Sequence, residues 1–199
     1  MNKEDELVLV VPSDKLFMKG IWQGLKTDNL DYYLELIKNN CEFRRRGDVE
    51  TDNSVQQIIP YILFSFQNKF FAFKYLAKAG EQRLVNNNYQ IGVGGHINKE
   101  DVDSGGDVVE AGMMREWDEE VTFKSNLISK KLVGIINDDT SPVEQVHLGL
   151  VYHFVGDSAD IQIKETEKME GNLFEIQELA NLDKSVWMNI VYQNYLSKL

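Results

Sequence analysis

Apolar residues recur along this chain in two kinds of pattern, one typical of strands and one typical of helices. Short apolar or alternating runs predict strands at residues 7–11, 58–66, 70–75, 89–97, 132–136 and 146–155. Apolar residues spaced three or four apart predict helices at residues 30–37, 108–121, 173–179 and 184–196. Strands and helices mixed along one chain indicate an α/β or α+β layered domain.

A polar stretch follows the first predicted helix and ends where the run of strands begins. It contains Arg44, Arg45 and Arg46 and a second polar run at residues 51–54, and it predicts a loop or a boundary. We therefore expect an N-terminal extension of residues 1–56 packed on a core domain of residues 57–199. The three arginines could reach the phosphates of a substrate, although a solvated basic run is the simpler interpretation.

The helix predicted at residues 108–121 has clear signals at its start and along one face. Asp107 is suited to cap its N-terminus, with Glu110 as the partner three residues later. An apolar stripe repeats every four residues at Val109, Met113, Trp117 and Val121. The sequence therefore predicts a well-defined amphipathic helix.

Another face of this helix is strongly acidic. Glu116, Glu119 and Glu120 stand at positions i, i+3 and i+4, where like charges repel by about 0.2–0.5 kcal/mol per pair. They also lie toward the helix C-terminus, where the dipole disfavours an anion by about 0.3–1 kcal/mol. Arg115 is the only basic residue nearby in the helix. We expect a cation on this face, with Mg²⁺ or Mn²⁺ favoured by the oxygen ligands; a solvated acidic face is the alternative.

The residues around this helix resemble the signature of the Nudix hydrolases, G-x5-E-x7-R-E-U-x-E-E-x-G-U, in which U is a bulky apolar residue. The match starts at Gly95, and its core R-E-U-x-E-E is complete at residues 115–120. There are three departures from the pattern. Six additional residues lie between Gly95 and Asp107, Asp107 takes the place of the first Glu, and Thr122 takes the place of the last Gly. None of them changes the three glutamates.

This resemblance implies an α/β/α sandwich with a mixed sheet, and an enzyme that hydrolyses a diphosphate linkage in a nucleoside-diphosphate-linked or related molecule. Catalysis would depend on Glu116, Glu119 and Glu120, which would hold one or more Mg²⁺ or Mn²⁺ ions together with the Gly95 carbonyl. Arg115 would orient a glutamate of the cluster. The general base stays open among Glu144, Glu165 and Glu167.

Two other functions are compatible with the same fold. The first is a catalytically silent module that binds a nucleotide and acts as a sensor, although binding alone does not require all three glutamates. The second is isomerisation of a prenyl diphosphate, which would need a reactive cysteine near the site. Cys41 lies far from the motif in the sequence, and we expect it to be a buried small residue.

Composition narrows the partners and the compartment. The chain has 199 residues and a net charge of −11, which argues against a nucleic-acid polymer as partner but allows a small phosphorylated substrate bridged by a metal ion. The acidic N-terminus does not suit a signal peptide, and no apolar run is long enough to cross a membrane. A single cysteine fits a reducing compartment. We expect a cytoplasmic protein, with a homodimer left open.

The weaker signals have simpler interpretations. Residues 101–106 resemble the start of a calcium-binding loop, but Gly112 occupies the position that requires Glu, so we predict a flexible acidic surface loop. His147 and His153 share a strand face and are expected to be half-buried structural residues. His96, next to Gly95, is expected to make a structural hydrogen bond.

Overall fold

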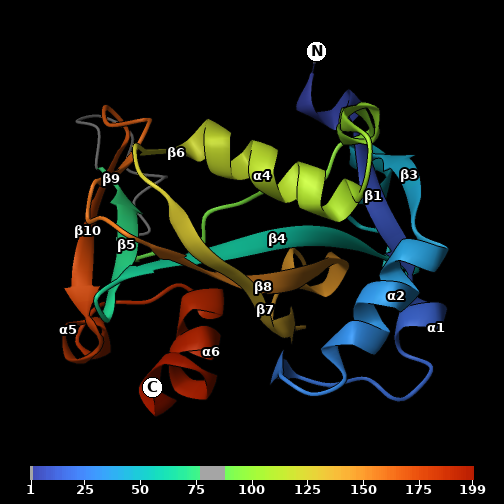
Figure 1. The fold of residues 1–199 in the computed structure, drawn as a ribbon. Helices are drawn as coiled ribbons and strands as arrows, with labels where there is room; N and C mark the ends of the chain where they lie inside the picture. Colours follow the sequence, from blue (N-terminus) through green and yellow to red (C-terminus); the bar gives the residue numbers. More distant parts are fainter. Residues whose placement is uncertain (1, 77–87) are drawn as a thin grey trace. The chain divides into compact units, whose positions relative to one another are not determined.

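The structure is a computed structural model of the chain and describes residues 2–76 and 88–199 (Figure 1). Its strands are β1 (Leu7–Pro12), β2 (Gly24–Lys26), β3 (Glu42–Arg45), β4 (Val55–Phe66), β5 (Lys69–Tyr75), β6 (Val121–Phe123), β7 (Leu127–Asn137), β8 (His147–Gly156), β9 (Ile161–Ile163) and β10 (Met169–Glu175). Its α-helices are α1 (Ser13–Leu16), α2 (Leu30–Asn40), α3 (Arg46–Val49), α4 (Val108–Glu120), α5 (Ile176–Ala180) and α6 (Val186–Asn194). The predicted α/β class is confirmed. None of the helices in the described ranges is long and apolar enough to span a membrane.

Most strands belong to one eight-stranded sheet with the order β10-β5-β4-β8-β7-β2, in which β1 pairs with both β3 and β4. The short strands β6 and β9 pair with each other. By contacts, the chain divides into two compact units. The first comprises Met1–Tyr61, Gly94–Glu116 and Leu132–Val151, and the second comprises Ile62–Val93, Trp117–Lys131 and Tyr152–Leu199. The predicted boundary between residues 56 and 57 stays a prediction.

The first unit is organised around β1, whose four central residues are fully buried. This burial explains why β1 is an uninterrupted apolar run and not an alternating one. β1 pairs antiparallel with β3 from Leu7↔Arg45 to Val10↔Glu42, and with β4 at Pro12↔Val55. The loop predicted after the first helix is therefore wrong: β3 and α3 occupy part of it. The pattern missed them because both consist of only four residues.

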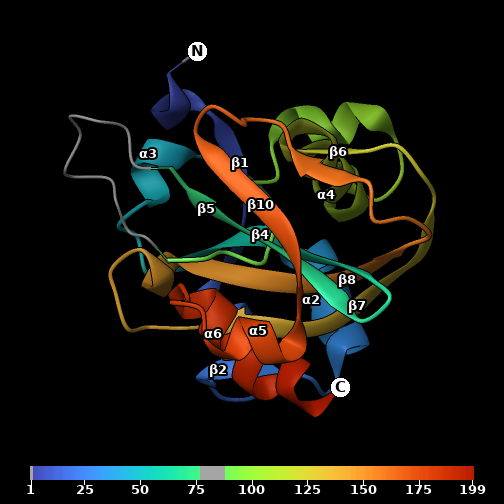
Figure 2. The same cartoon turned by 90° about the vertical axis from the view of Figure 1, so that its left-hand side faces the viewer.

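The second unit contains the β4–β5 hairpin and β10, which pairs with β5 from Met169↔Tyr75 to Glu175↔Lys69 (Figure 2). Gln67 and Asn68 form the hairpin turn in the left-handed region, with φ of 47° and 64°. The helix predicted at 173–179 is partly wrong, because its first residues belong to β10 and α5 starts at Ile176. Leu173 and Phe174 are compatible with a helix or with a strand, and their pairing with β5 makes them part of a strand.

The strand predicted at residues 89–97 is also wrong. The structure has only isolated bridges there, including Phe73↔Gln90 and Ile62↔Val93. Gly94 adopts a φ of +149°, and a Cβ on it would lie 1.9 Å from the Pro60 carbonyl oxygen. Close packing of the backbone at Gly94 therefore takes the place of regular hydrogen-bonded strand pairing in this segment.

Candidate functional site

Helix α4 starts and packs as its sequence predicts. Asp107 Oδ1 accepts a hydrogen bond from the Val109 backbone N–H at 3.0 Å, which is an N-cap contact. Asp107 also forms an ion pair with Lys38 at 2.6 Å. The predicted apolar stripe of Val109, Met113, Trp117 and Val121 is buried at every position. In the second unit, Trp117 packs against the rings of Phe64, Phe123 and Phe154.

Arg115 is the centre of a buried charged cluster in the first unit. Its guanidinium donates to both carboxylate oxygens of Asp101, at 2.7 and 3.1 Å, and to Glu116 Oε1 at 2.7 Å. A further bond reaches the backbone carbonyl of His96 at 2.8 Å. Burial lowers the pKa of Arg115, but the bonds from Asp101 and Glu116 outweigh that effect and raise the pKa above its ordinary value. Arg115 therefore bonds directly to Glu116, one of the glutamates of the motif.

Asp101, and not Asp107, is the acid that meets Arg115. Five residues separate Gly95 from Asp101, which is the spacing of the first Glu in the signature. The six additional residues therefore lie between Asp101 and Arg115, and Asp107 caps the helix and pairs with Lys38. The flexible surface loop predicted at 101–106 is wrong for Asp101, since this residue is only 4% exposed. Asp101 also accepts the backbone N–H of Asn98 at 2.8 Å, which closes a capping box at a short 3-10 helix.

Gly95 lies against the Glu116 carboxylate. A Cβ on Gly95 would lie 2.7 Å from Glu116 Oε2, so any larger residue there would displace the Glu116 carboxylate. Glu116 thus meets Arg115 through Oε1 and Gly95 on the side of Oε2. Two of the four predicted metal ligands are therefore neighbours in the first unit.

Glu119 and Glu120 lie at the end of α4 that belongs to the second unit. Glu119 is exposed and Glu120 is half-buried. The backbone N–H of Lys164 donates to the Glu120 carbonyl at 2.8 Å, and the Lys164 ammonium donates to the Asp118 carbonyl. This lysine satisfies carbonyl groups of the last helical turn and places a cation at the negative end of the dipole. Arg115 is therefore not the only basic residue near the acidic face.

The oxygen ligands on α4 suit a hard divalent cation, but the described part of the structure contains no preformed set of metal ligands. Within residues 2–76 and 88–199, no three side chains of His, Cys, Asp or Glu are arranged so that they could hold a metal ion together. The helix supplies oxygen donors at Glu116, Glu119 and Glu120, and Gly95 leaves room beside Glu116 where a Cβ would otherwise lie. Oxygen donors of this kind suit Mg²⁺ and Mn²⁺.

The three candidates for the general base lie in different surroundings. Glu144 starts a 3-10 turn of the first unit. In the second unit, Glu165 forms an ion pair with Lys168 at 2.9 Å, and Glu167 is exposed. The pKa of Tyr75 is raised by burial and then by the charges of Glu120 and Glu165. Glu165 therefore shares a neighbour with Glu120.

A histidine network supports the backbone beside Gly95. His96 Nε2 lies 2.8 Å from Gln57 Oε1, which confirms the predicted structural hydrogen bond. His147 is buried, not half-buried as predicted; its Nδ1 donates to the Val143 carbonyl at 2.6 Å, and its Nε2 lies 3.3 Å from His96 Nε2. The pKa of His96 is lowered to about 3, first by burial and then by neighbouring positive charges. His96 is therefore neutral at neutral pH.

The three consecutive arginines form ion pairs with acidic residues of the first unit. Arg45 pairs with Asp5 and Asp48 at 2.7 and 3.0 Å. Similar pairs join Arg44 to Glu42 and Asp52, and Arg46 to Glu6 and Glu50. These contacts identify the arginines as structural residues that connect β3 and α3 with the N-terminal segment. Cys41 is half-buried, and burial raises the pKa of its thiol.

Comparison with known proteins agrees with this arrangement. No family model matches the chain. Protein YmaB from Bacillus subtilis (strain 168) is 32% identical over 192 residues, which cover 92% of each protein. The solved structure of Tm1382, described as a candidate Nudix hydrolase, matches 98% of this chain and 100% of that chain, with a TM-score of 0.83 and 25% identity.

A MutT structure, from work on the Aliivibrio salmonicida and Vibrio cholerae proteins, shares the fold over 72% of this chain and 99% of that chain, with a TM-score of 0.50 and 16% identity. The MutT match shows a shared fold, and the Tm1382 match supports a Nudix-type hydrolase at the level of the general reaction. The motif on α4, the Arg115 cluster and the structural matches agree: the chain belongs to the Nudix superfamily, in one family with Protein YmaB.

Proposed function

We propose that this protein is a metal-dependent hydrolase that cleaves a diphosphate linkage in a nucleoside-diphosphate-linked or related phosphorylated small molecule. One observation carries the proposal. Arg115 joins Asp101 to Glu116, and Glu116 lies against Gly95, so residues from both ends of the motif meet. A solvated acidic face would not require a half-buried arginine that bonds to two buried carboxylates.

Each residue of the motif has a distinct role in this proposal. Glu116, Glu119 and Glu120 supply anionic oxygen ligands for Mg²⁺ or Mn²⁺, and Gly95 contributes its backbone. When bound, such an ion neutralises charge on the diphosphate and makes water more acidic. Arg115 is a positioning residue that fixes the orientation of Glu116. The net charge of −11 disfavours an anionic substrate, and a bound cation between the two would offset this repulsion.

Glu165 is the general base that the surroundings favour among the three candidates. Its charge and that of Glu120 both act on Tyr75, which supports a position near one of the proposed metal ligands. We expect Glu165→Gln to lower kcat. Glu167→Gln, a neighbouring exposed glutamate, is the matched control. Equal loss in both variants would reject Glu165 as the base.

A hydrolysis screen tests the proposal as a whole. Nucleotide sugars, dinucleoside polyphosphates, dinucleotides and nucleoside triphosphates are incubated with the protein and Mg²⁺ or Mn²⁺, and the phosphorylated products are measured. We expect turnover of at least one substrate, its loss in EDTA, and its recovery when the metal is restored. Turnover that persists in EDTA would reject the metal dependence.

The two alternatives predict different results in this screen when a prenyl diphosphate is added to the panel. A sensor would bind a nucleotide tightly and hydrolyse no compound of the panel. An isomerase would rearrange a prenyl diphosphate without releasing phosphate, and it would need an activated cysteine. The raised pKa of the Cys41 thiol disfavours the reactive thiolate, so the hydrolase is the better-supported function.

A further inference from the structure

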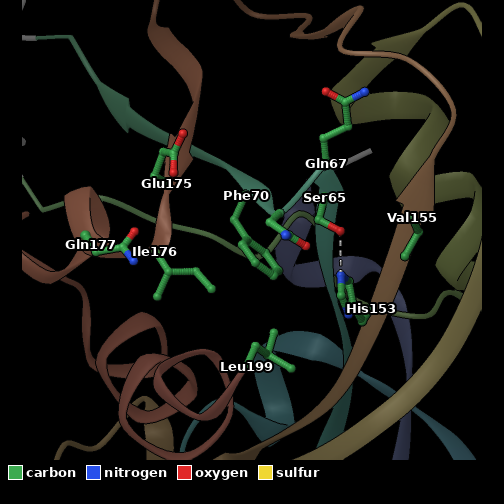
Figure 3. Close-up of a pocket in the computed structure, with 10 residues that line it drawn as sticks. Ser65, Gln67, Phe70, His153, Val155, Glu175, Ile176, Gln177 and Leu199 are labelled. Carbon is green, nitrogen blue, oxygen red and sulfur yellow. Dashed lines mark hydrogen bonds between the residues drawn. The ribbon is translucent and has the colours of Figure 1, made fainter.

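The second unit contains a cavity of about 690 Å³, formed where β4 ends, β5 starts, and β10 passes into α5 (Figure 3). This volume lies within the range of about 300–1,000 Å³ that is typical of small-molecule sites. All the residues that line it belong to the second unit. None of them has a role in the proposed hydrolysis, so the cavity needs an explanation of its own.

A chain of neutral hydrogen-bonding groups lies in the wall of the cavity. Ser65 Oγ is 2.8 Å from His153 Nε2, and His153 Nδ1 is 2.9 Å from the Tyr195 hydroxyl. Burial lowers the pKa of His153, so the ring is neutral at neutral pH and donates through one nitrogen while it accepts through the other. When His153 donates to Ser65, the serine O–H is left to donate to a ligand. In the other tautomer, the serine oxygen can accept.

The rest of the lining combines apolar surface with amides. The rings of Phe70 and His153 pack at a centroid distance of 5.3 Å and an angle of 33°, and Val155 and Ile176 add aliphatic surface. Figure 3 shows Phe70, Ile176 and His153 around the same space. Three exposed amides, of Gln67, Asn68 and Gln177, also line it. Each amide offers donors and an acceptor.

The charge of the cavity is unsuited to a phosphate. Among its lining residues the only ionisable acidic side chain is that of Glu175, and there is neither a lysine nor an arginine. Lys69 lies 3.5 Å from Glu175, so the cation closest to this carboxylate is already paired with it. A phosphate monoester in this cavity would therefore find no unpaired cation among the lining residues to bind its charge.

From these features we propose that the cavity binds an uncharged, planar heterocycle with several hydrogen-bonding groups, a chemistry that nucleosides represent. The ring would lie against the surface of His153, Val155 and Ile176. Its polar edge would bond to Ser65 and to the amide of Gln177. This site is independent of the α4 carboxylates and of any phosphorylated substrate.

Calorimetry with adenosine, guanosine, cytidine and uridine tests the proposal on the full chain. EDTA is present, so that binding through a metal ion on α4 does not contribute. We expect at least one nucleoside to bind with a millimolar or tighter Kd and to raise the Tm. Its 5′-monophosphate should bind at least about tenfold more weakly, which corresponds to about 1.4 kcal/mol. Absence of binding by all four, or tighter binding of the monophosphate, would overturn the proposal.

Variants locate the site. Val155→Phe fills the cavity and should weaken binding at least about tenfold, whereas Gln177→Ala removes one neutral hydrogen bond and should weaken it about two- to tenfold. Gln193→Ala changes an exposed amide on α6 outside the lining and should leave the Kd unchanged. Gln177 is exposed, so this variant still tests the site if Val155→Phe does not fold. Unchanged binding in Gln177→Ala together with either unchanged binding or misfolding of Val155→Phe would overturn the assignment.

Discussion

The acidic residues on and beside the C-terminal half of α4 fall into two regions that compensate negative charge in different ways. In the first unit, Glu116 and Asp101 are buried, and both bond to the Arg115 guanidinium. In the second unit, Glu119 is exposed and Glu120 is half-buried, and the nearby Lys164 ammonium bonds to a backbone carbonyl. The first region depends on fixed side-chain pairs, whereas the second is screened by solvent.

This difference separates residues that hold the structure from residues expected to act in the reaction. Removing one partner of a buried pair leaves a charge in a medium that solvates it poorly, and this lowers the free energy of unfolding. Neutralising a carboxylate near solvent costs little stability, but it removes a ligand charge that the reaction needs. The predictions below test this separation.

The largest effect is expected from breaking the buried cluster. Arg115→Met leaves Asp101 and Glu116 without their shared cation, so we expect the free energy of unfolding to fall by about 3–5 kcal/mol. Lys164→Met removes the cation of the other region and should cost only about 0.3–1 kcal/mol. Urea unfolding measures both variants. Similar losses would show that the two regions do not differ as proposed.

The next effect concerns activity. Glu120→Gln keeps the side-chain volume and should fold, but it removes one anionic ligand and should lower kcat by on the order of 10²-fold or more. Glu110→Gln, at an exposed position in the first turn of the same helix, is the matched control and should keep its kcat. The assay uses the best substrate of the hydrolysis screen. An unchanged kcat in Glu120→Gln would place the catalytic metal on other residues.

A third prediction concerns acid sensitivity in the first unit. The pKa of His96 is about 3 in the folded protein and about 6.5 in an unfolded chain. The unfolded state therefore binds a proton first as the pH falls below 6.5, and this contribution to stability is lost between pH 6.5 and about pH 3. Between pH 7 and 5 the loss should be about 2 kcal/mol.

Urea unfolding at several pH values, with a chelator present, measures this contribution. His96→Gln has no group that titrates at this position, so its stability should fall less steeply than that of the wild type over the same range. The other titrating groups are common to both proteins, and their effects cancel in the comparison. Parallel curves would mean that His96 does not resist protonation in the folded state.

Local patterns predicted α4 well, because its determinants lie within one helix. The Asp107 cap and the buried stripe depend on contacts one turn apart, and such contacts follow directly from residue spacing. Arg115 and Glu116 are adjacent, so their ion pair could also be predicted from the sequence. The family signature added the expected roles of the three glutamates.

Contacts between distant residues could not be predicted in the same way. Asp101 was overlooked because the six additional residues can be placed on either side of it, although counting five residues from Gly95 would have identified it. Nothing in the sequence indicates that Lys164 reaches the end of α4. The Ser65–His153 pair joins two strands whose register a single sequence does not define.

The smallest expected effect tests the exposed region directly. Glu119→Gln removes repulsion with Glu116 and Glu120 and an unfavourable interaction with the helix dipole, while Arg115 stays bonded to Asp101 and Glu116. Without metal, we expect the variant to be as stable as the wild type or more stable by about 0.2–0.5 kcal/mol. Glu110→Gln should instead lower the stability slightly, because an anion near the helix N-terminus is stabilising. Added Mg²⁺ or Mn²⁺ should then stabilise the wild type more than Glu119→Gln, since an ion stabilises the native state more when it binds more tightly. Equal thermal shifts in the two proteins would mean that the ion binds without Glu119.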